Sequence, residues 1–248
     1  KIKNGEMGVV PVQGEVYTLL LGFMRRAVKT TENNKASALV FDLDTYGGRL
    51  DTATDMVNAL NQINIPTYTF INTNAGSAGA LIAIGTQHIY MAPVSAIGAA
   101  APILSTGEDL PATAKEKTIS YWSALVRGSA LKNGHNPDLA EAFMNKDKEV
   151  KIGDRVVHPK GAILTVNAPE ATEKINGKPL LAEGIVDSIP DLIKKAGLKG
   201  EIVKVEPTGF EQIAFWITAL APLLLLGGIL GAYLEFKIPG AILPGVIS

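Results

Sequence analysis

The sequence predicts an α/β domain followed by a helix that crosses a membrane. Residues 7–205 alternate strand-like and helix-like segments, with lengths typical of parallel strands joined by right-handed crossover helices. Residues 213–234 carry no charge, and about 20 apolar residues are enough to span a bilayer. We therefore expect two domains, a folded domain at residues 1–206 and a membrane segment at residues 207–248.

The first part of the folded domain contains three strand–turn–helix units and a fourth strand. The strands are rich in Val, Ile, Phe, Tyr and Thr, whereas the helices repeat apolar residues with a period near 3.6. Pro66 closes the second helix, because proline cannot continue a helix. The expected strands are residues 7–14, 36–44, 66–72 and 87–93, and the expected helices are residues 14–34, 49–64 and 77–85.

The second part of the folded domain is expected to be more mixed. Residues 115–134 and 137–147 have the helical period. Residues 161–171 and 184–198 predict a strand, a turn and a final helix, and residues 201–209 predict a last strand or connector.

Composition excludes several classes of function. The net charge of -1 and the pI near 6.4 provide no basic surface for nucleic acid. The chain has no cysteine, which excludes disulfides, thiolate metal sites and a cysteine nucleophile and leaves the redox compartment open. Because the sequence begins at Lys1 rather than methionine, we expect a processed or truncated protein, and a removed signal peptide would account for this.

The C-terminal segment has further features of a membrane span. Trp216 and Tyr233 lie toward its two ends, as interfacial aromatic residues do. Pro222 and the pair Gly227–Gly228 are unusual in a soluble helix but are tolerated in membranes. The alternative is a buried core helix or a dimerisation helix. The apolar residues 238–248 that follow Lys237 predict the start of a second membrane element.

Two turns that follow strands are candidates for chemistry. The first is "DTYGGRLDTA", which contains Gly47 and Gly48, and the second is "NAGSAGA", which contains Ser77. Because the carboxyl ends of parallel strands meet at one edge of a sheet, we expect both turns to lie together. The N–H groups of Gly48 and Ala78 would then form an oxyanion hole beside a nucleophilic Ser77. The alternative is a tight turn and an ordinary helix-capping serine.

A nucleophilic serine needs a base, and the residues alone leave its identity open. His88, His135 and His158 form no recognisable pattern with Ser77, so a Ser-His-Asp triad has no support. A lysine becomes a base when loss of water lowers its pKa toward neutrality. Lys117 stands near Ile119, Tyr121 and Trp122, which would permit partial burial, and Lys115 is its near neighbour. The spacing alone favours a solvated lysine at either position.

These segments together resemble the membrane-bound ClpP-class serine proteases of the NfeD family and, more distantly, the signal peptide peptidase SppA. "DTYGGRLDTA" is similar to the family's Gly-Gly motif, and "NAGSAGALIAIGTQHIYMAPVSAIGAAAPI" is similar to its nucleophile segment and the run that lines the cleft. "KEKTISYWSAL" resembles the helix with the catalytic lysine. In the family an aromatic pair follows that lysine by four and five residues, so Tyr121 and Trp122 select Lys117 over Lys115.

The resemblance implies a fold, an activity and a set of roles. The fold is the ClpP/crotonase-like spiral of ββα units, and the activity is that of a serine endopeptidase with a Ser-Lys dyad, without metal or cofactor. The implied substrates are apolar segments of membrane proteins such as stomatin-like (SPFH) partners, and the implied state is a homo-oligomer. The roles are nucleophile for Ser77, base for Lys117, oxyanion donors for Gly48 and Ala78, and substrate cleft for Gly47, Gly76, Ile97, Gly98 and Ala99.

The sequence departs from the family pattern at two places. Tyr46 replaces the proline that usually precedes Gly-Gly, which alters the turn but leaves its N–H groups available. Residues 151–187 are longer than the family's strand–turn–strand, which leaves substrate contacts there open. Long family members continue through further membrane helices into a small β-barrel.

Two other functions and the side of the membrane stay open. The first is a non-catalytic scaffold for stomatin-like proteins, and the second is a crotonase that acts on acyl-CoA with Glu108 and Asp109 as carboxylates. The excess of lysine before the span over Lys237 after it favours a cytoplasmic domain. The family resemblance instead favours an extracytoplasmic protease domain, which is the side we expect.

Overall fold

The computed structural model describes residues 2–103 and 108–237. By its internal contacts the chain divides into two compact units, Lys1–Glu206 and Pro207–Ser248. The first unit contains every strand of the described chain, and the second contains one long helix. The predicted second membrane element at residues 238–248 lies outside the described residues.

Three strand–helix units open the first unit, as the sequence predicts. The strands of the described residues are β1 (Met7–Val16), β2 (Ala38–Gly48), β3 (Thr67–Gly76), β4 (His88–Met91), β5 (Ala96–Gly98), β6 (Val150–Ile152), β7 (Arg155–His158), β8 (Thr165–Asn167), β9 (Lys174–Ile175), β10 (Lys178–Pro179), β11 (Gly184–Ile185) and β12 (Ile202–Lys204). The helices of the first unit are α1 (Thr18–Asn33), α2 (Leu50–Leu60), α3 (Ala78–Ile84), α4 (Ala112–Asn133), α5 (Pro137–Ala142), α6 (Ala168–Thr172) and α7 (Ile189–Lys195).

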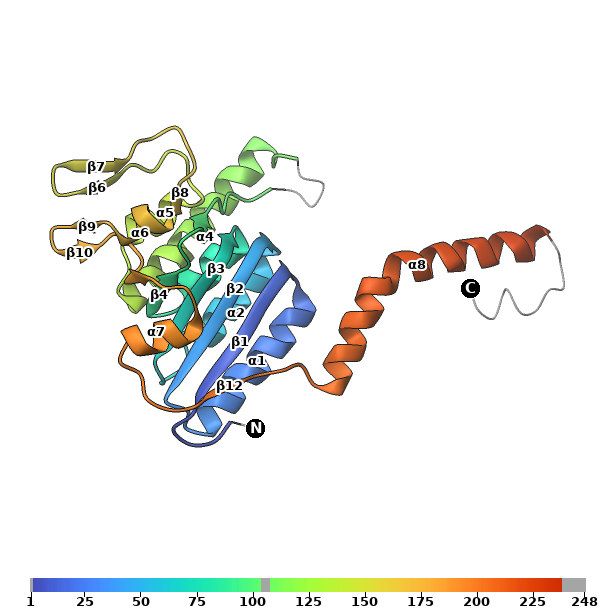
Figure 1. The fold of residues 1–248 in the computed structure, drawn as a ribbon. Coiled ribbons are helices and arrows are strands. Elements are labelled where there is room, and N and C mark those ends of the chain that lie inside the picture. The colour runs from blue at the N-terminus through green and yellow to red at the C-terminus, as the bar shows by residue number, and fades with distance from the viewer. Residues whose placement is uncertain (1, 104–107, 238–248) are drawn as a thin grey trace. The chain divides into compact units, whose positions relative to one another are not determined.

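The main sheet is parallel along its central path. Its strand order is β11-β4-β3-β2-β1-β12, and β5 extends β3 and pairs with β8 in antiparallel fashion. Met7 pairs with Ala38, Leu39 with Thr67 and Tyr68 with His88, so the strands start at one edge and end at the opposite edge (Figure 1). The turns after β2 and β3 therefore lie at the same edge of the sheet, as expected.

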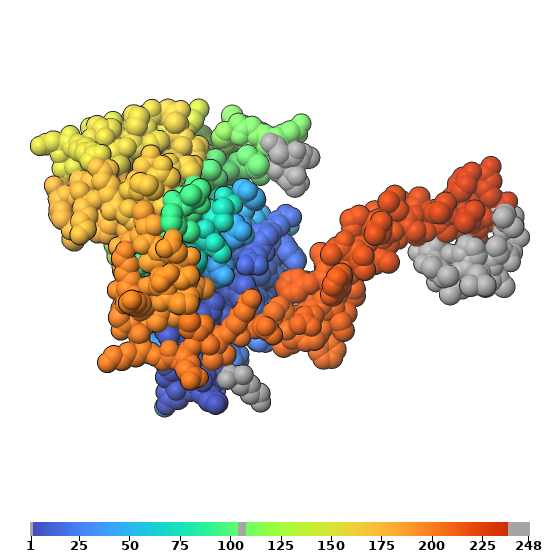
Figure 2. Space-filling model, in the orientation of Figure 1, coloured from blue at the N-terminus to red at the C-terminus, as the bar shows by residue number. Residues whose placement is uncertain are grey.

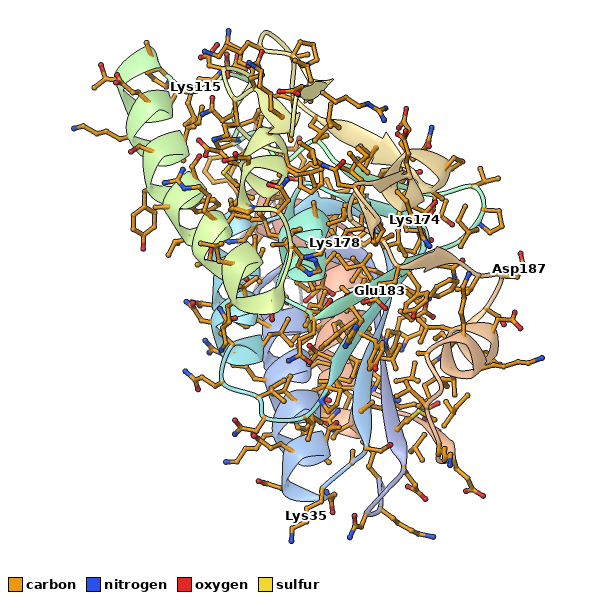
Figure 3. The ribbon with its side chains drawn as sticks, turned by 90° about the vertical axis from the view of Figure 1, so that its left-hand side faces the viewer. Lys35, Lys115, Lys174, Lys178, Glu183 and Asp187 are labelled. Atoms are coloured by element: carbon orange, nitrogen blue, oxygen red, sulfur yellow. The ribbon has the colours of Figure 1, made fainter. Side chains whose placement is uncertain are left out.

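Apolar side chains fill both faces of this sheet. Helix α7 covers one face, and α1, α2 and α4 lie on the other side (Figures 1 and 3). On the α7 face, Val40, Phe70 and Leu192 are buried in one cluster. On the other side, α1 contributes the buried Phe23 and Met24. A strand that is buried on both faces has apolar residues at consecutive positions, which explains the unbroken apolar run at residues 38–41.

One boundary differs from the sequence-based expectation in a way that affects the site. Residues 14–16 were predicted to begin the first helix, but β1 continues to Val16 and α1 begins at Thr18. The extension pairs Val16 with Gly48, the last residue of β2. Long-range pairing therefore outweighs the local helical pattern, and it holds the Gly-Gly turn from one side.

The long segment at residues 151–187 forms two small hairpins and a short helix. Strands β6 and β7 pair with each other, as do β9 and β10, and α6 follows β8. Asn167 and Glu170 form a reciprocal capping box at the start of α6. Figure 2 shows this segment, in yellow to light orange, gathered at one end of the first unit beside the green segment near residues 110–120.

Within its described residues, the second unit consists mainly of helix α8 (Gly209–Lys237). By length and composition this helix is long and apolar enough to cross a membrane. Pro222 lies within it, and the ribbon of α8 bends along its length (Figure 1).

The carboxyl group of Asp42 on β2 makes stability depend on pH. Burial raises the pKa of Asp42 above its ordinary value, and this outweighs a hydrogen bond from Asn72 and the positive charge of Lys204. One carboxyl oxygen, Oδ1, is buried without a hydrogen-bond partner among the described residues. Because the folded state prefers the protonated acid, this group costs stability as the pH rises above the unfolded pKa of about 3.9.

We expect Asp42→Asn to stabilise the protein at neutral pH by up to about 1 kcal/mol, since the carboxyl is only partly buried. The advantage should shrink toward zero near pH 4, where the acid is protonated in both states. Thermal unfolding of the full chain in detergent at pH 4.5 and pH 7 measures this difference. An advantage that is unchanged or smaller at pH 7 would contradict the assignment.

Candidate active site

The backbone at Ser77 is strained. Strand β3 ends at Gly76 and α3 begins at Ala78, so Ser77 alone makes the turn between them. Its φ of 50° and ψ of -116° lie in a region that residues with a side chain rarely occupy, at a cost of about 1–3 kcal/mol. The Ser77 N–H donates a hydrogen bond of 2.9 Å to the Gly98 carbonyl, which helps to hold the turn. A strained strand–turn–helix corner is the setting of a nucleophile elbow, in which the turn exposes the serine hydroxyl.

The Gly-Gly turn lies directly against Ser77. A Cβ atom at Gly47 would be 2.5 Å from the Ser77 Cβ and 3.1 Å from its Oγ, so only glycine fits there. A Cβ atom at Gly48 would be 2.2 Å from the Val16 carbonyl oxygen, and φ at Gly48 is 150°. The two turns that the sequence placed at one edge of the sheet are therefore in contact.

The other residues predicted for the cleft lie around this contact. Gly48, Ser77 and Ala99 line one cavity of about 700 Å³. Gly98 supports Ser77 through its carbonyl, while Ile97 and Ala78 are fully buried. Gly76 packs against the backbone of Tyr46, with 3.0 Å between its ideal Cβ position and the Tyr46 carbonyl oxygen. The described lining of the Ser77 cavity also includes Tyr46, Pro102, Ile103, Leu110, Thr118 and Trp122.

Lys117 does not lie in this cavity. Its side chain is exposed on α4, where it borders a separate shallow groove with Glu116 and Tyr121. Thr118 and Trp122, on the neighbouring side of the helix, face the Ser77 cavity instead. The partial burial considered for Lys117 is therefore not found, because the packing of α4 turns that position toward solvent, and the solvated lysine that the spacing favours is observed.

Lys115 lies near the start of α4 and is engaged by a carboxylate. Its Nζ donates to Asp109 Oδ1 at 2.7 Å, and this hydrogen bond lowers the pKa of the Asp109 carboxyl. Figure 3 shows Lys115 at the opposite end of the unit from Lys35, which precedes β2. The start of α4 therefore lies toward the edge of the sheet where β2 ends.

The histidines lie elsewhere. His88 Nδ1 is 2.6 Å from Glu183 Oε1, and this hydrogen bond lowers the pKa of the Glu183 carboxyl. His135 Nε2 is 2.6 Å from the Thr86 carbonyl oxygen, and burial lowers the pKa of this ring. His158 Nε2 is 2.9 Å from the Ala162 carbonyl oxygen. Since no histidine is among the described residues of the Ser77 cavity, a Ser-His-Asp triad gains no support.

The carboxylates considered for an acyl-CoA enzyme are also absent from the described lining of the Ser77 cavity. Asp109 is engaged by Lys115, and Glu108 precedes it in the chain. Within residues 2–103 and 108–237, no group of three or more His, Asp or Glu side chains is arranged to hold a metal ion.

A family model described as the N-terminal domain of NfeD1b matches residues 6–206, which is most of the chain. The chain belongs to the NfeD1b family. The match covers the two turns and α4, and it ends at the boundary between the two compact units.

Two relatives of this NfeD1b-family chain are similar over nearly its whole length. The membrane protein NfeD1b of Bacillus subtilis is 35% identical over 248 residues, which cover 99% of this chain and 54% of the relative. The membrane-bound protease PH1510 of Pyrococcus horikoshii is 27% identical over 249 residues, which cover 97% of this chain and 55% of the relative. The chain thus spans about half the length of the curated relatives it matches.

Solved structures establish the fold. The 1510-N membrane-bound stomatin-specific protease, in a lysine-to-alanine mutant bound to a substrate peptide, superposes with a TM-score of 0.68 at 24% identity, covering 88% of this chain and all of the other. ClpP1 from Listeria monocytogenes superposes with a TM-score of 0.53 at 12% identity, covering 77% and 94%. The predicted ClpP-like α/β fold is confirmed.

The sequence analysis missed one residue that positions the site. Thr45 is 1% exposed, and its Oγ1 accepts a hydrogen bond of 3.0 Å from the Gly47 N–H. A Cβ atom at Gly79 would be 2.6 Å from Thr45 Cγ2, so the same side chain also packs on the start of α3. The available signal was a threonine two positions before Gly-Gly, at the end of a strand that begins with the apolar run of residues 38–41. Thr45 therefore ties the Gly-Gly turn to the Ser77 turn.

Proposed function

We propose that residues 1–206 form a serine endopeptidase domain, that residues 207–248 anchor it in a membrane, and that Ser77 is the nucleophile. The observation that carries this proposal is the strained Ser77 turn in direct contact with Gly47, inside a cavity that also includes Gly48. A serine of ordinary structural role would not need a turn that costs folding energy.

The reaction follows from these groups. The Ser77 hydroxyl attacks the carbonyl carbon of a peptide bond, and its proton passes to a base. The N–H groups of Gly48 and Ala78 stabilise the oxyanion that forms, and the proton then goes to the leaving amine. Water hydrolyses the resulting acyl-enzyme and restores the hydroxyl.

Lys117 is the base in this proposal, as the family resemblance implies. Its side chain is exposed, and a hydrated lysine is a poor base. Lys117 directly precedes Thr118, which lines the Ser77 cavity, but consecutive residues of a helix point about 100° apart, so the first turns of α4 must rotate or shift for the amine to reach the cavity. An apolar peptide in the cavity would exclude water and favour the neutral amine.

The proposed substrates are apolar segments of membrane proteins, including stomatin-like partners. The description of the Pyrococcus relative as a stomatin-specific protease with a bound substrate peptide supports this. Pro102, Ile103 and Leu110 give the Ser77 cavity an apolar portion that is suited to such segments. The charged residues Glu15, Arg49 and Asp51 also line this cavity. An extracytoplasmic protease domain and a homo-oligomer remain predictions.

A fluorophosphonate probe tests the nucleophile and its base. We expect labelling of the full chain in detergent at Ser77 and none in Ser77→Ala. Lys117→Arg keeps the positive charge but provides no base, so labelling should slow by about 100-fold.

Lys115→Arg is the matched control and should label at the parent rate. If Lys115→Arg is slow instead, the base is Lys115. A chain that is not labelled at all would favour the non-catalytic scaffold, because a scaffold needs no activated serine.

A further inference from the structure

A second cavity adjoins the cavity of Ser77. It has a volume of about 610 Å³, within the range of about 300–1,000 Å³ that is usual for ligand pockets. Ala101 lines both cavities, and α4 separates their remaining walls. Thr118 and Trp122 face the Ser77 cavity, whereas Ile119 and Ser123 face the second one. The two cavities therefore lie on neighbouring sides of the same stretch of α4.

A buried hydroxyl in the wall of the second cavity lacks a partner. Ser123 is 2% exposed, and its Oγ has no hydrogen-bond partner among the described residues. A buried polar group without a partner costs about 1–3 kcal/mol, so it calls for a physical reason. A ligand that supplies the missing hydrogen bond would provide that reason.

The charges around Ser123 are already compensated within the protein. Arg127, one helical turn further along α4, donates to Glu141 Oε2 at 2.8 Å, and Asn145 Nδ2 donates to Glu141 Oε1 at 3.1 Å. Burial alone would raise the pKa of Glu141, but the hydrogen bonds from Arg127 and Asn145 outweigh it and hold that pKa below its ordinary value. Lys115, which lines the cavity near the start of α4, donates a hydrogen bond to Asp109.

The remaining charged groups of the second cavity lie at its exposed rim. They are Glu116, Lys146 and Asp147, with both signs represented. Ala101, Ile119, Met144 and Ile163 make the rest of the wall largely apolar. A charged ligand would therefore find no unpaired buried counter-ion, whereas an uncharged group with one hydrogen-bonding function would fit.

We propose that the second cavity is a specificity subsite that holds an uncharged hydrogen-bonding side chain of the substrate, such as Gln or Asn, against Ser123. This inference rests on the proposed peptidase function, because the adjoining Ser77 cavity holds the scissile bond. The substrate segment is then mainly apolar with one amide side chain at a fixed distance from the cleaved bond.

Peptide binding to the full-length Ser77→Ala chain in detergent tests the subsite without requiring cleavage. The probe is a fluorescent apolar peptide in which each position in turn is Gln or Leu, and fluorescence anisotropy measures its Kd. At one position we expect Gln to bind about three- to tenfold more tightly than Leu. Adding Ser123→Ala should reduce that preference to below twofold without lowering the unfolding temperature, because the hydroxyl has no partner in the free protein.

Ser129→Ala is the matched control on the same helix. Ser129 is also buried, but its Oγ is 3.4 Å from Asn133 Nδ2, and it lines a different cavity. Ser129→Ala should keep the preference for Gln. The inference is overturned if Gln and Leu bind alike at every position, or if Ser123→Ala leaves the preference unchanged.

The outcomes also separate this inference from the proposed function. A parent chain that cleaves peptides and shows no Ser123-dependent preference would overturn the subsite alone. A Ser123-dependent preference in a chain that neither cleaves nor reacts with the fluorophosphonate would support a peptide-binding cavity and overturn the peptidase.

Discussion

Ser77→Ala is expected to lower kcat/KM for cleavage of an apolar peptide by about 1,000-fold or more. Loss of the nucleophile in serine peptidases leaves only the contribution of oxyanion stabilisation and binding. The substitution removes one oxygen and leaves the turn intact, since Ala occupies the strained conformation no less readily than Ser. Unfolding of the variant in detergent should therefore match that of the parent.

Two further variants separate the role of the Ser77 hydroxyl from its effect on stability. Ser77→Gly should also abolish cleavage but stabilise the fold by about 1 kcal/mol, because glycine tolerates the φ of 50° at Ser77. Ser95→Ala removes a buried hydroxyl that donates to the Ala92 carbonyl at 2.7 Å, so it should cost stability and spare cleavage. A Ser77→Ala protein that retains more than a tenth of the parent's kcat/KM would exclude Ser77 as the nucleophile.

Gly48→Ala is expected to destabilise the folded domain by about 3–4 kcal/mol. The new methyl group would meet three backbone atoms of Val16, at 2.2, 2.6 and 2.8 Å, and backbone cannot move aside as a flexible side chain can. The φ of 150° at Gly48 adds strain for any residue with a Cβ atom. The unfolding temperature in detergent should fall by about 10 °C, and cleavage should be lost with the geometry of the turn.

Gly22→Ala is the matched control for Gly48→Ala. Gly22 lies in α1, and an added Cβ would meet no atom within 4 Å. Because Ala is the better helix former, this variant should be more stable by up to about 1 kcal/mol. If Gly48→Ala unfolds at the parent temperature, the Gly-Gly turn does not hold the close contact with β1 that supports the site.

Ser77 and the Gly-Gly turn belong to one connected set of contacts at the edge of the sheet. Thr45 and the Val16–Gly48 pairing hold the Gly-Gly turn, and that turn packs on the strained Ser77. Thr45 and Val16 restrain the Gly-Gly turn, and the Gly-Gly turn restrains Ser77. The strained backbone of Ser77 is therefore maintained only while these contacts are in place. A change at Thr45, Val16 or Gly48, which hold the Gly-Gly turn, should therefore affect both stability and chemistry.

The resting position of Lys117 suggests how activity is limited. The Lys117 side chain is exposed, and Thr118 and Trp122 from the same helix line the Ser77 cavity instead. Activity in this proposal requires a substrate or partner that brings the amine into a dry cavity. Such a requirement would protect other membrane proteins from indiscriminate cleavage.

The order of the elements and the two turns at the candidate site could be predicted from the amino-acid sequence. Strand-like runs ending in Gly47–Gly48 and in Gly76–Ser77 were sufficient to place both turns at one sheet edge, because parallel strands end together. The resemblance carried by the same segments predicted the family and the ClpP-like fold, and the comparisons confirm both. The uncharged run near the C-terminus likewise predicted a helix long enough to cross a membrane.

The side of α4 that faces the Ser77 cavity depends on packing and could not be predicted from the amino-acid sequence. Local periodicity could not distinguish Lys117 from Thr118, since the helix has no strong apolar stripe and its rotation is set by the elements that pack on it. The extension of β1 to Val16 and the unpartnered hydroxyl of Ser123 also depend on contacts between segments distant in the chain. Secondary structure and strand ends follow from neighbouring residues, whereas exposure, strain and hydrogen-bond partners follow from packing.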